Sequence, residues 1–121
     1  GGIPVVREAG RLVGVEAVVD KDRAAAVLAK MVGAERLIIL TSVPEVYVRF
    51  GKPDQRALRR VKIGDLRRFR EANEFPAGSM GPKIDSAVEF IESGGRRVII
   101  SDAAMLLEAC AGAAGTHVLP D

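Results

Sequence analysis

The sequence is poor in the residues that build disulfide-linked, zinc-binding or aromatic-rich proteins. Its 121 residues include one cysteine, one histidine and no tryptophan, and aromatic side chains make up 4% of the chain. The single Cys110 excludes an internal disulfide and a zinc site made of several cysteines. Alanines flank Cys110 on both sides, so we expect it to be a small buried residue. His117 lies in a strand-like run and is expected to be a packed or surface residue rather than a catalytic one.

Long apolar segments are also missing. No apolar run approaches the roughly 20 residues that a membrane helix needs, and no basic and apolar secretory signal opens the chain. We therefore expect a soluble, cytoplasmic protein without membrane contact.

The apolar residues that are present indicate an α/β protein. Hydrophobic residues make up 48% of the chain, and with so few aromatics the core must consist of Val, Ile, Leu and Ala. The short apolar runs Leu37–Leu40 and Val98–Ile100 are typical of buried parallel strands. The length suits one domain or a piece of one.

Helical patterns alternate with these strands. Asp20 can cap a helix from Lys21 to about Met31, and Lys83–Glu92 has one apolar stripe. Further helices are predicted at Gln55–Arg60, Gly64–Glu71 and Asp102–Ala111, and further strands at Val46–Phe50, Val61–Ile63 and Thr116–Leu119. The alternation favours a layered sandwich with a largely parallel sheet, where ligands bind beyond the carboxyl ends of the strands. The loop after Leu40 is therefore part of the candidate site, with the helix starts at Lys21 and Lys83 converging on it.

The glycine-flanked loop Gly78–Lys83 is the stretch where chemistry is expected. It runs into a helical pattern that begins at Ile84, and its glycines allow backbone amides to approach a bound group. A helix N-terminus favours anions, and a lysine beside it, Lys83, is suited to phosphoryl transfer. By itself such a loop is more often only a turn.

A basic cluster is the other notable feature of a chain whose net charge is only +2. Its members are Arg56, Arg59, Arg60, Lys62, Arg67, Arg68 and Arg70. It is either a phosphate-binding face or a solvated helix surface, and we favour the second because no zinc-finger, RRM or KH pattern accompanies it.

Three runs carry a family resemblance: Gly14–Asp22, Tyr47–Gln55 and Gly78–Lys83. In sequence, order and spacing they resemble the C-terminal half of the carbamate kinase family, which belongs to the amino acid kinase fold. The resemblance implies a three-layer α/β/α sandwich around a mainly parallel sheet. It also implies that residues 1–121 form the C-terminal, nucleotide-binding part of the domain, with the N-terminal, substrate-binding half absent.

The same resemblance implies a function. Such kinases move a phosphoryl group between ATP and carbamate with Mg²⁺, or regenerate ATP from carbamoyl phosphate in arginine metabolism, in the cytoplasm and as homodimers. The chemistry is reasonable from the residues alone, because two ammonium groups, Mg²⁺ and one organising carboxylate can suffice when the acceptor is already an anion. No nucleic-acid partner is expected on this interpretation.

Individual roles follow from the matching motifs. Lys21 and Lys83 match lysines that contact the transferring and leaving phosphates, and Asp22 matches the aspartate that orients them. The nucleotide-binding matches are Tyr47, Phe50, Lys52, Gly78 and Met80. Gly1 and Gly2 match the end of a glycine-rich loop near the carbamate-phosphate side, and no residue is predicted as a metal ligand.

Three interpretations remain open from the sequence. The chain is a carbamate kinase half that is inactive in isolation, a nucleotide-binding or dimerising remnant without transferase activity, or a nucleic-acid module that uses the basic cluster. Another kinase of the same fold is a lesser possibility. If half the sheet is missing, strand edges and apolar surface are exposed, and association with another chain or poor solubility is expected.

Overall fold

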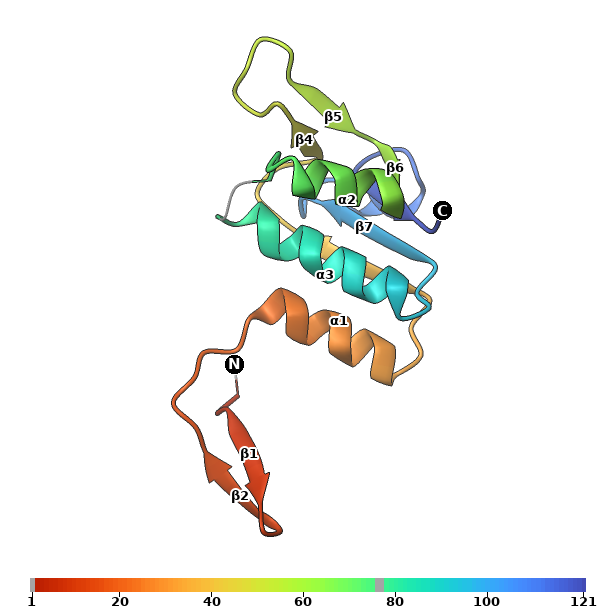
Figure 1. Ribbon diagram of the computed structural model, residues 1–121. Helices are drawn as coiled ribbons and strands as arrows, with labels where there is room; N and C mark the ends of the chain where they lie inside the picture. Colours follow the sequence, from red (N-terminus) through yellow and green to blue (C-terminus); the bar gives the residue numbers. More distant parts are fainter. Residues whose placement is uncertain (1, 76–77) are drawn as a thin grey trace.

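The computed structural model describes residues 2–75 and 78–121 and is built around a four-stranded sheet (Figure 1). Its strands, in spatial order, are β3 (Arg36–Leu40), β7 (Arg97–Ser101), β8 (Thr116–Leu119) and β6 (Arg60–Lys62). The β3–β7 and β8–β6 pairs are parallel, and β7–β8 is antiparallel. The sheet is therefore mixed, with two of its three pairings parallel, as expected for an α/β protein with a mainly parallel sheet.

Helices cover both faces of this sheet. The first face carries α1 (Lys21–Met31), α2 (Ile63–Glu71) and α3 (Met80–Glu92), and the short α4 (Leu106–Cys110) lies on the other (Figure 1). Ala109 of α4 is fully buried, close to where a side chain at Gly115 would lie. The described residues thus form three layers, and the predicted α/β/α arrangement is confirmed.

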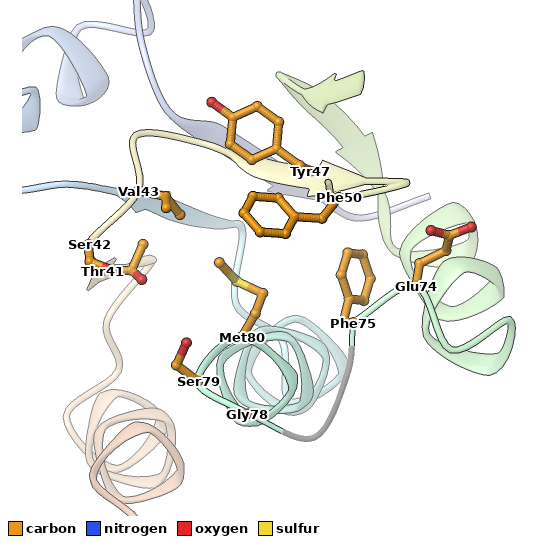
Figure 2. Close-up of a pocket in the computed structure, with 10 residues that line it drawn as sticks. All are labelled: Thr41, Ser42, Val43, Tyr47, Phe50, Glu74, Phe75, Gly78, Ser79 and Met80. Carbon is orange, nitrogen blue, oxygen red and sulfur yellow. The ribbon is translucent and has the colours of Figure 1, made fainter. Parts of the chain in front are cut away.

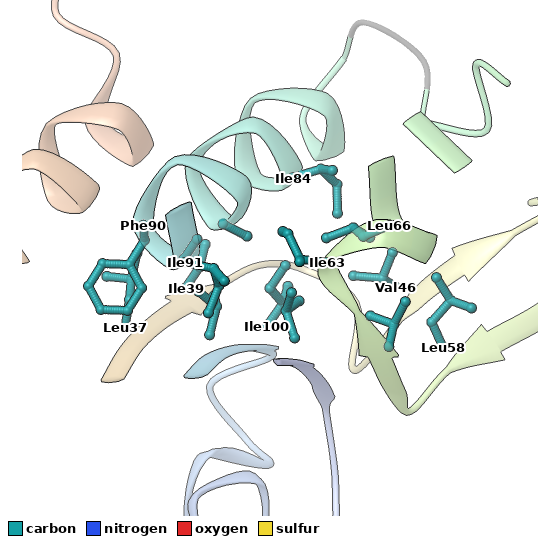
Figure 3. Packing of buried hydrophobic residues seen from close by; sticks show 14 of the residues in the cluster. Leu37, Ile39, Val46, Leu58, Ile63, Leu66, Ile84, Phe90, Ile91 and Ile100 are labelled. Atoms are coloured by element: carbon teal, nitrogen blue, oxygen red, sulfur yellow. The ribbon is translucent and has the colours of Figure 1, made fainter. Parts of the chain in front are cut away.

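The core lies between the sheet and α3 (Figure 3). Exposure alternates along β3, so that Leu37 and Ile39 face the helices. They meet α3 through its buried stripe, which includes Ile84 and Ile91. Burying each such side chain stabilises the fold by about 1.5–3 kcal/mol. This packing holds α3 at a constant position over the sheet.

Two hairpins flank the sheet. β1 (Val5–Glu8) and β2 (Arg11–Gly14) pair around a turn in which Ala9 and Gly10 have φ of 45° and 80°, as tight hairpin turns require. All residues of both strands are exposed, and this hairpin extends away from the helices in Figure 1. The second hairpin pairs β4 (Val46–Val48) with β5 (Arg56–Leu58).

Thr116 of β8 fastens the second hairpin to the sheet. Its buried hydroxyl accepts a 2.8 Å hydrogen bond from the backbone N–H of Val46 and donates to the carbonyl of Leu58. One side chain therefore connects both strands of the hairpin to the edge where the sheet strands β3 and β7 end.

The helix predicted at Gln55–Arg60 is wrong. Residues 56–58 form β5, with Leu58 opposite Val46, and the chain continues directly into β6. Local propensity is a weak signal, and pairing with β4, together with the Thr116 contact, decides the structure of this segment. The extended piece predicted at Val61–Ile63 overlaps β6.

Three other predictions need correction. α3 begins at Met80 rather than at Ile84, so Pro82 lies within its first turn, where its missing N–H costs nothing. The last helix is shorter than Asp102–Ala111, because the Asp102 carboxylate accepts a 2.8 Å hydrogen bond from Met105 N–H and forms a turn before α4. Cys110 is exposed, since the neighbouring Ala109 takes the buried position on α4.

Apolar side chains are exposed at a strand edge, as expected from the sequence, and also on α1. β3 is an edge strand of the four-stranded sheet, and its Ile38 and Leu40 are exposed. Leu28 and Met31 on α1 are also exposed. Association with another chain stays a prediction. Within residues 2–75 and 78–121, no helix combines the length and apolar character that crossing a bilayer requires.

Candidate functional site

A buried ion pair joins the first turns of α1 and α3. The ammonium of Lys83 lies 2.9 Å from Asp22 Oδ2, and the two residues are only 5% and 8% exposed. Asp20 accepts a 2.8 Å hydrogen bond from Arg23 N–H and begins α1, which places Asp22 on the helix side that faces α3. The structure therefore brings two of the three predicted catalytic residues into direct contact.

Lys21 lies beside this pair. Its ammonium is 3.8 Å from the same Asp22 oxygen, but 83% of its side chain is exposed. The carboxylate thus lies between one buried and one solvent-facing ammonium. Positive charge concentrated in this way, partly shielded from water, suits the binding of a phosphate group.

A pocket of about 240 Å³ opens at the start of α3 (Figure 2). Its lining is formed by Thr41, Ser42, Val43, Tyr47, Phe50, Glu74, Phe75, Gly78, Ser79 and Met80. Four of the five residues predicted to bind nucleotide, Tyr47, Phe50, Gly78 and Met80, are among them. The loop after β3, which was expected in the site, contributes the first three residues of the lining.

The size and composition of the pocket favour a flat ring. Drug-sized ligands occupy pockets of roughly 300–1,000 Å³, so this smaller volume suits one ring system rather than a complete nucleotide. Figure 2 shows the rings of Phe50 and Phe75 near the Met80 side chain. Tyr47 and Phe50 lie with their ring centroids 6.1 Å apart and tilted by 50°, within the range of favourable aromatic pairs.

The first turn of α3 connects the pocket with the ion pair. Met80 lines the pocket, and Lys83 follows three residues later, a spacing that places side chains about 5–6 Å apart at Cβ. Ser79 makes no side-chain cap on this helix, and the first N–H groups of a helix have no acceptor within the helix itself. A ring in the pocket with a phosphate over these amides and lysines matches the shape of a nucleotide.

Lys52 and Gly2 are not brought to this pocket. Lys52 is exposed in the β4–β5 loop and is absent from the pocket lining. Gly2 is exposed before β1 and lines no part of it either. Gly1 lies outside the described residues. The roles predicted for these three residues stay predictions.

Glu74 and Phe75 are the lining residues that the motifs did not single out. Phe75 is only 1% exposed and lines the pocket. Glu74 Oε2 accepts a 2.8 Å hydrogen bond from the backbone N–H of Arg49, across 25 residues of sequence. Both lie a few residues before the glycine loop, and Asn73-Glu74 stands where the family that the sequence resembles usually has Gly-His, but no role was predicted for either.

The β4–β5 loop is held by a further charge pair at its base. Arg49 Nε lies 2.9 Å from Asp54 Oδ2, and this hydrogen bond keeps the pKa of the Asp54 carboxyl below its ordinary value. Asp54 is solvent-exposed, so the contact adds little stability. It does connect the two ends of the β4–β5 loop.

Acidic partners neutralise much of the basic cluster. Arg59 pairs with Glu45 at 3.3 Å, and Arg70 pairs with Asp85 at 2.8 Å. The Asp85 hydrogen bond raises the pKa of Arg70. Arg67 and Arg68 are likewise paired, with Glu92 and Asp65. These contacts favour a solvated, ion-paired surface over a nucleic-acid interface.

No protein cage for a metal ion is found in the described parts of the chain. In residues 2–75 and 78–121, no three His, Cys, Asp or Glu side chains lie together as ligands. Mg²⁺ commonly needs only one or two carboxylates when substrate phosphates supply the rest. The site is thus compatible with a magnesium ion carried by a nucleotide.

Sequence comparison assigns the family. The model of the amino acid kinase family matches residues 1–102, most of the chain. The chain belongs to the amino acid kinase family. This match includes both lysines, Asp22 and the whole pocket.

Among the members of this family, the chain is similar to carbamate kinases in sequence and in structure. The chain is 43% identical to a carbamate kinase of Thermoplasma volcanium and 47% identical to one of Pyrococcus furiosus, each over 99% of its length. It also superimposes on a carbamate kinase of Giardia lamblia bound to AMP-PNP, with a TM-score of 0.95, 39% identity and 100% of the chain covered. The chain spans about two fifths of these proteins, 39% and 38% of the two sequences and 42% of the solved chain.

Proposed function

We propose that this chain carries the nucleotide-binding part of a carbamate kinase, an enzyme that moves a phosphoryl group between ATP and carbamate. The observation that carries the proposal is the buried Lys83–Asp22 pair, one helical turn from a ring-sized pocket. The relatives named carbamate kinase, and the AMP-PNP-bound structure of one, support this assignment over another substrate of the family.

Each residue has a role in this proposal. The base occupies the apolar pocket against Phe50 and Met80, and the phosphates extend over the first amides of α3. Lys83 neutralises charge on the leaving phosphate, while the exposed Lys21 follows the transferring group as a mobile point charge. Asp22 orients both ammonium groups. A magnesium ion bound to the nucleotide phosphates would supply further charge neutralisation.

The wider assignments are part of the same proposal. Carbamate or carbamoyl phosphate is the substrate, ATP and ADP with Mg²⁺ are the cofactors, and arginine metabolism in the cytoplasm is the setting. A homodimer is expected as the assembly. The alternative, a nucleotide-binding remnant without transfer, predicts the same binding but no turnover.

Lys21 offers the cleanest test because its exposed side chain contributes little to folding. Lys21→Ala should weaken binding of the magnesium complex of AMP-PNP, which has a group in the position of the transferring phosphate, by about tenfold through loss of a charge-assisted contact. Adenosine has no phosphate, so its affinity should not change. Lys30→Ala is the matched control, since Lys30 is an exposed lysine about 14 Å further along the same helix.

Calorimetric titrations with the magnesium complex of AMP-PNP and with adenosine separate the outcomes. Equal losses in both lysine variants, or an equal loss for adenosine, would contradict a phosphate site at Lys21. Transfer itself is tested by ATP formation from carbamoyl phosphate and MgADP. ATP formation would exclude the remnant, whereas binding without ATP formation is expected both for an isolated kinase half and for a remnant.

A further inference from the structure

Phe50 occupies an unusual position for a residue that lines a pocket. It is 65% exposed, so burial does not determine where its ring lies. The preceding Arg49 has a φ of 58°, in the left-handed region that non-glycine residues rarely adopt. The backbone that presents Phe50 must therefore be held in place by a contact from elsewhere.

Glu74 provides this contact. Its carboxylate oxygen accepts the hydrogen bond from Arg49 N–H at 2.8 Å, while the other loop contacts, such as Arg49 with Asp54, lie within the loop itself. In Figure 2 the Phe50 ring lies between Tyr47 and Met80, and Glu74 lies to the side, next to Phe75. Glu74 thus connects the loop to the opposite side of the pocket.

The end of α2 gives Glu74 a defined position. Asn73 has a φ of 56° and donates to the carbonyl of Arg70, and Glu74 N–H donates to the carbonyl of Phe69. This is the left-handed helix ending in which asparagine substitutes for glycine. The next residue, Phe75, is buried. Glu74 is therefore anchored on both sides before its side chain reaches Arg49.

We propose that Glu74 is a positioning residue for nucleotide binding. Through Arg49 N–H it holds the Phe50 ring over the pocket, where the ring can stack on a base. The inference rests on the proposed function, because it assumes that the pocket takes a nucleobase. Stacking of a base on an aromatic side chain contributes about 1–3 kcal/mol, so the position of Phe50 affects affinity directly.

Tyr47 allows the positioning to be measured without any ligand. It is the only tyrosine of a chain that has no tryptophan, and it lies against Phe50. Its near-ultraviolet circular dichroism therefore reports the order of this corner of the pocket. Glu74→Ala should lose much of this signal, whereas Glu74→Gln, which keeps an acceptor oxygen, should retain it. Glu71→Ala, an exposed carboxylate at the end of α2, is the matched control.

A double-mutant cycle on MgADP affinity tests whether Glu74 affects binding through Phe50. Glu74→Ala should weaken binding by about tenfold, and Glu74→Gln by no more than about threefold. Because Glu74 acts through Phe50, the same Glu74→Ala change should cost less than about twofold in a Phe50→Ala background. Thermal unfolding of each variant shows that it is folded at the assay temperature.

The outcomes separate this inference from the function on which it rests. An equal loss with and without Phe50, or weaker binding with an unchanged tyrosine signal, would overturn the positioning role. Unchanged affinity and signal in Glu74→Ala would overturn it too while leaving nucleotide binding intact. If the unsubstituted chain binds no MgADP, but Glu74→Ala still loses the tyrosine signal, the proposed function fails and the loop-positioning contact stands.

Discussion

Lys83 and Asp22, 61 residues apart in the sequence, form a buried ion pair with their charged atoms 2.9 Å apart. Removing one partner leaves the other charge buried without compensation, which typically costs 3–5 kcal/mol, whereas replacing both by apolar or neutral groups can be nearly neutral. We expect Lys83→Ala to lower the free energy of unfolding by about 3 kcal/mol. The partly compensating Lys21 keeps the loss at the lower end of that range.

The double variant Lys83→Met with Asp22→Asn is the control for this prediction. It should recover at least half of the lost free energy in urea unfolding, although it removes two proposed functional groups. A double variant as unstable as Lys83→Ala would mean that the pair stabilises the fold by itself. If the double variant recovers stability but does not bind MgADP, the pair is needed for nucleotide binding rather than for folding.

One glycine lies near each end of α3, and replacing the two by alanine should affect the stability of the fold differently. A Cβ at Gly95 would lie 2.3 Å from Cε1 of the buried Phe90 ring, so Gly95→Ala should destabilise the fold by about 1–3 kcal/mol. A Cβ at Gly78 meets no atom of the described residues within 4 Å. Gly78→Ala should change stability by less than about 0.5 kcal/mol.

The same Gly78→Ala variant tests the proposed close approach of the nucleotide. If the backbone at Gly78 contacts the ligand, the added methyl group should weaken MgADP binding severalfold although folding is unchanged. Thermal unfolding and calorimetry on one preparation give both values. Wild-type affinity in this variant would place the nucleotide away from Gly78.

The Arg49–Asp54 contact predicts a pH dependence for the β4–β5 loop. The Arg49 hydrogen bond holds the pKa of Asp54 below its ordinary 3.8, so the charged carboxylate favours the folded loop. This contribution is complete above pH 3.8 and disappears as the pH falls through the lowered pKa. Asp54→Asn should therefore slightly lower the Tm at pH 7 relative to the unsubstituted chain. The difference should vanish in strong acid, and a difference that grows in acid would contradict this sign.

The exposed apolar residues of α1 predict self-association. Leu28 and Met31 are 59% and 77% exposed, and exposed apolar patches promote association between proteins. Replacing both by lysine should shift sedimentation velocity profiles towards the monomer and raise solubility, with little change in stability. Unchanged sedimentation at the same protein concentration would show that association, if present, uses another surface.

Helices and strands that are determined by residues adjacent in the sequence could be predicted. α1 has the predicted bounds because Asp20 is a strong cap and the alanines that follow favour a helix. The apolar runs of β3 and β7 identified a parallel strand pair. The prediction of burial holds for β7, but β3 is an edge strand with Ile38 and Leu40 exposed. The loop after β3 was placed correctly because it follows the carboxyl end of that strand.

Contacts between distant segments could not be predicted in this way. β5 depends on the pairing of Leu58 with Val46, and the Glu74 contact with Arg49 depends on how α2 ends. Neither leaves a local pattern. The α/β pattern predicted that the helix starts at Lys21 and Lys83 converge, but the pairing of Lys83 with Asp22 was implied only by the family resemblance.

The central claim is that a nucleotide binds at the start of α3, and an NMR titration of the ¹⁵N-labelled chain with MgADP tests it directly. The account predicts shifts of backbone amide signals concentrated in the loop after β3, in Tyr47–Phe50 and in Gly78–Lys83. Amides of the basic cluster and of the β1–β2 hairpin should not change. Shifts centred on the basic cluster, or no shifts at millimolar MgADP, would contradict it.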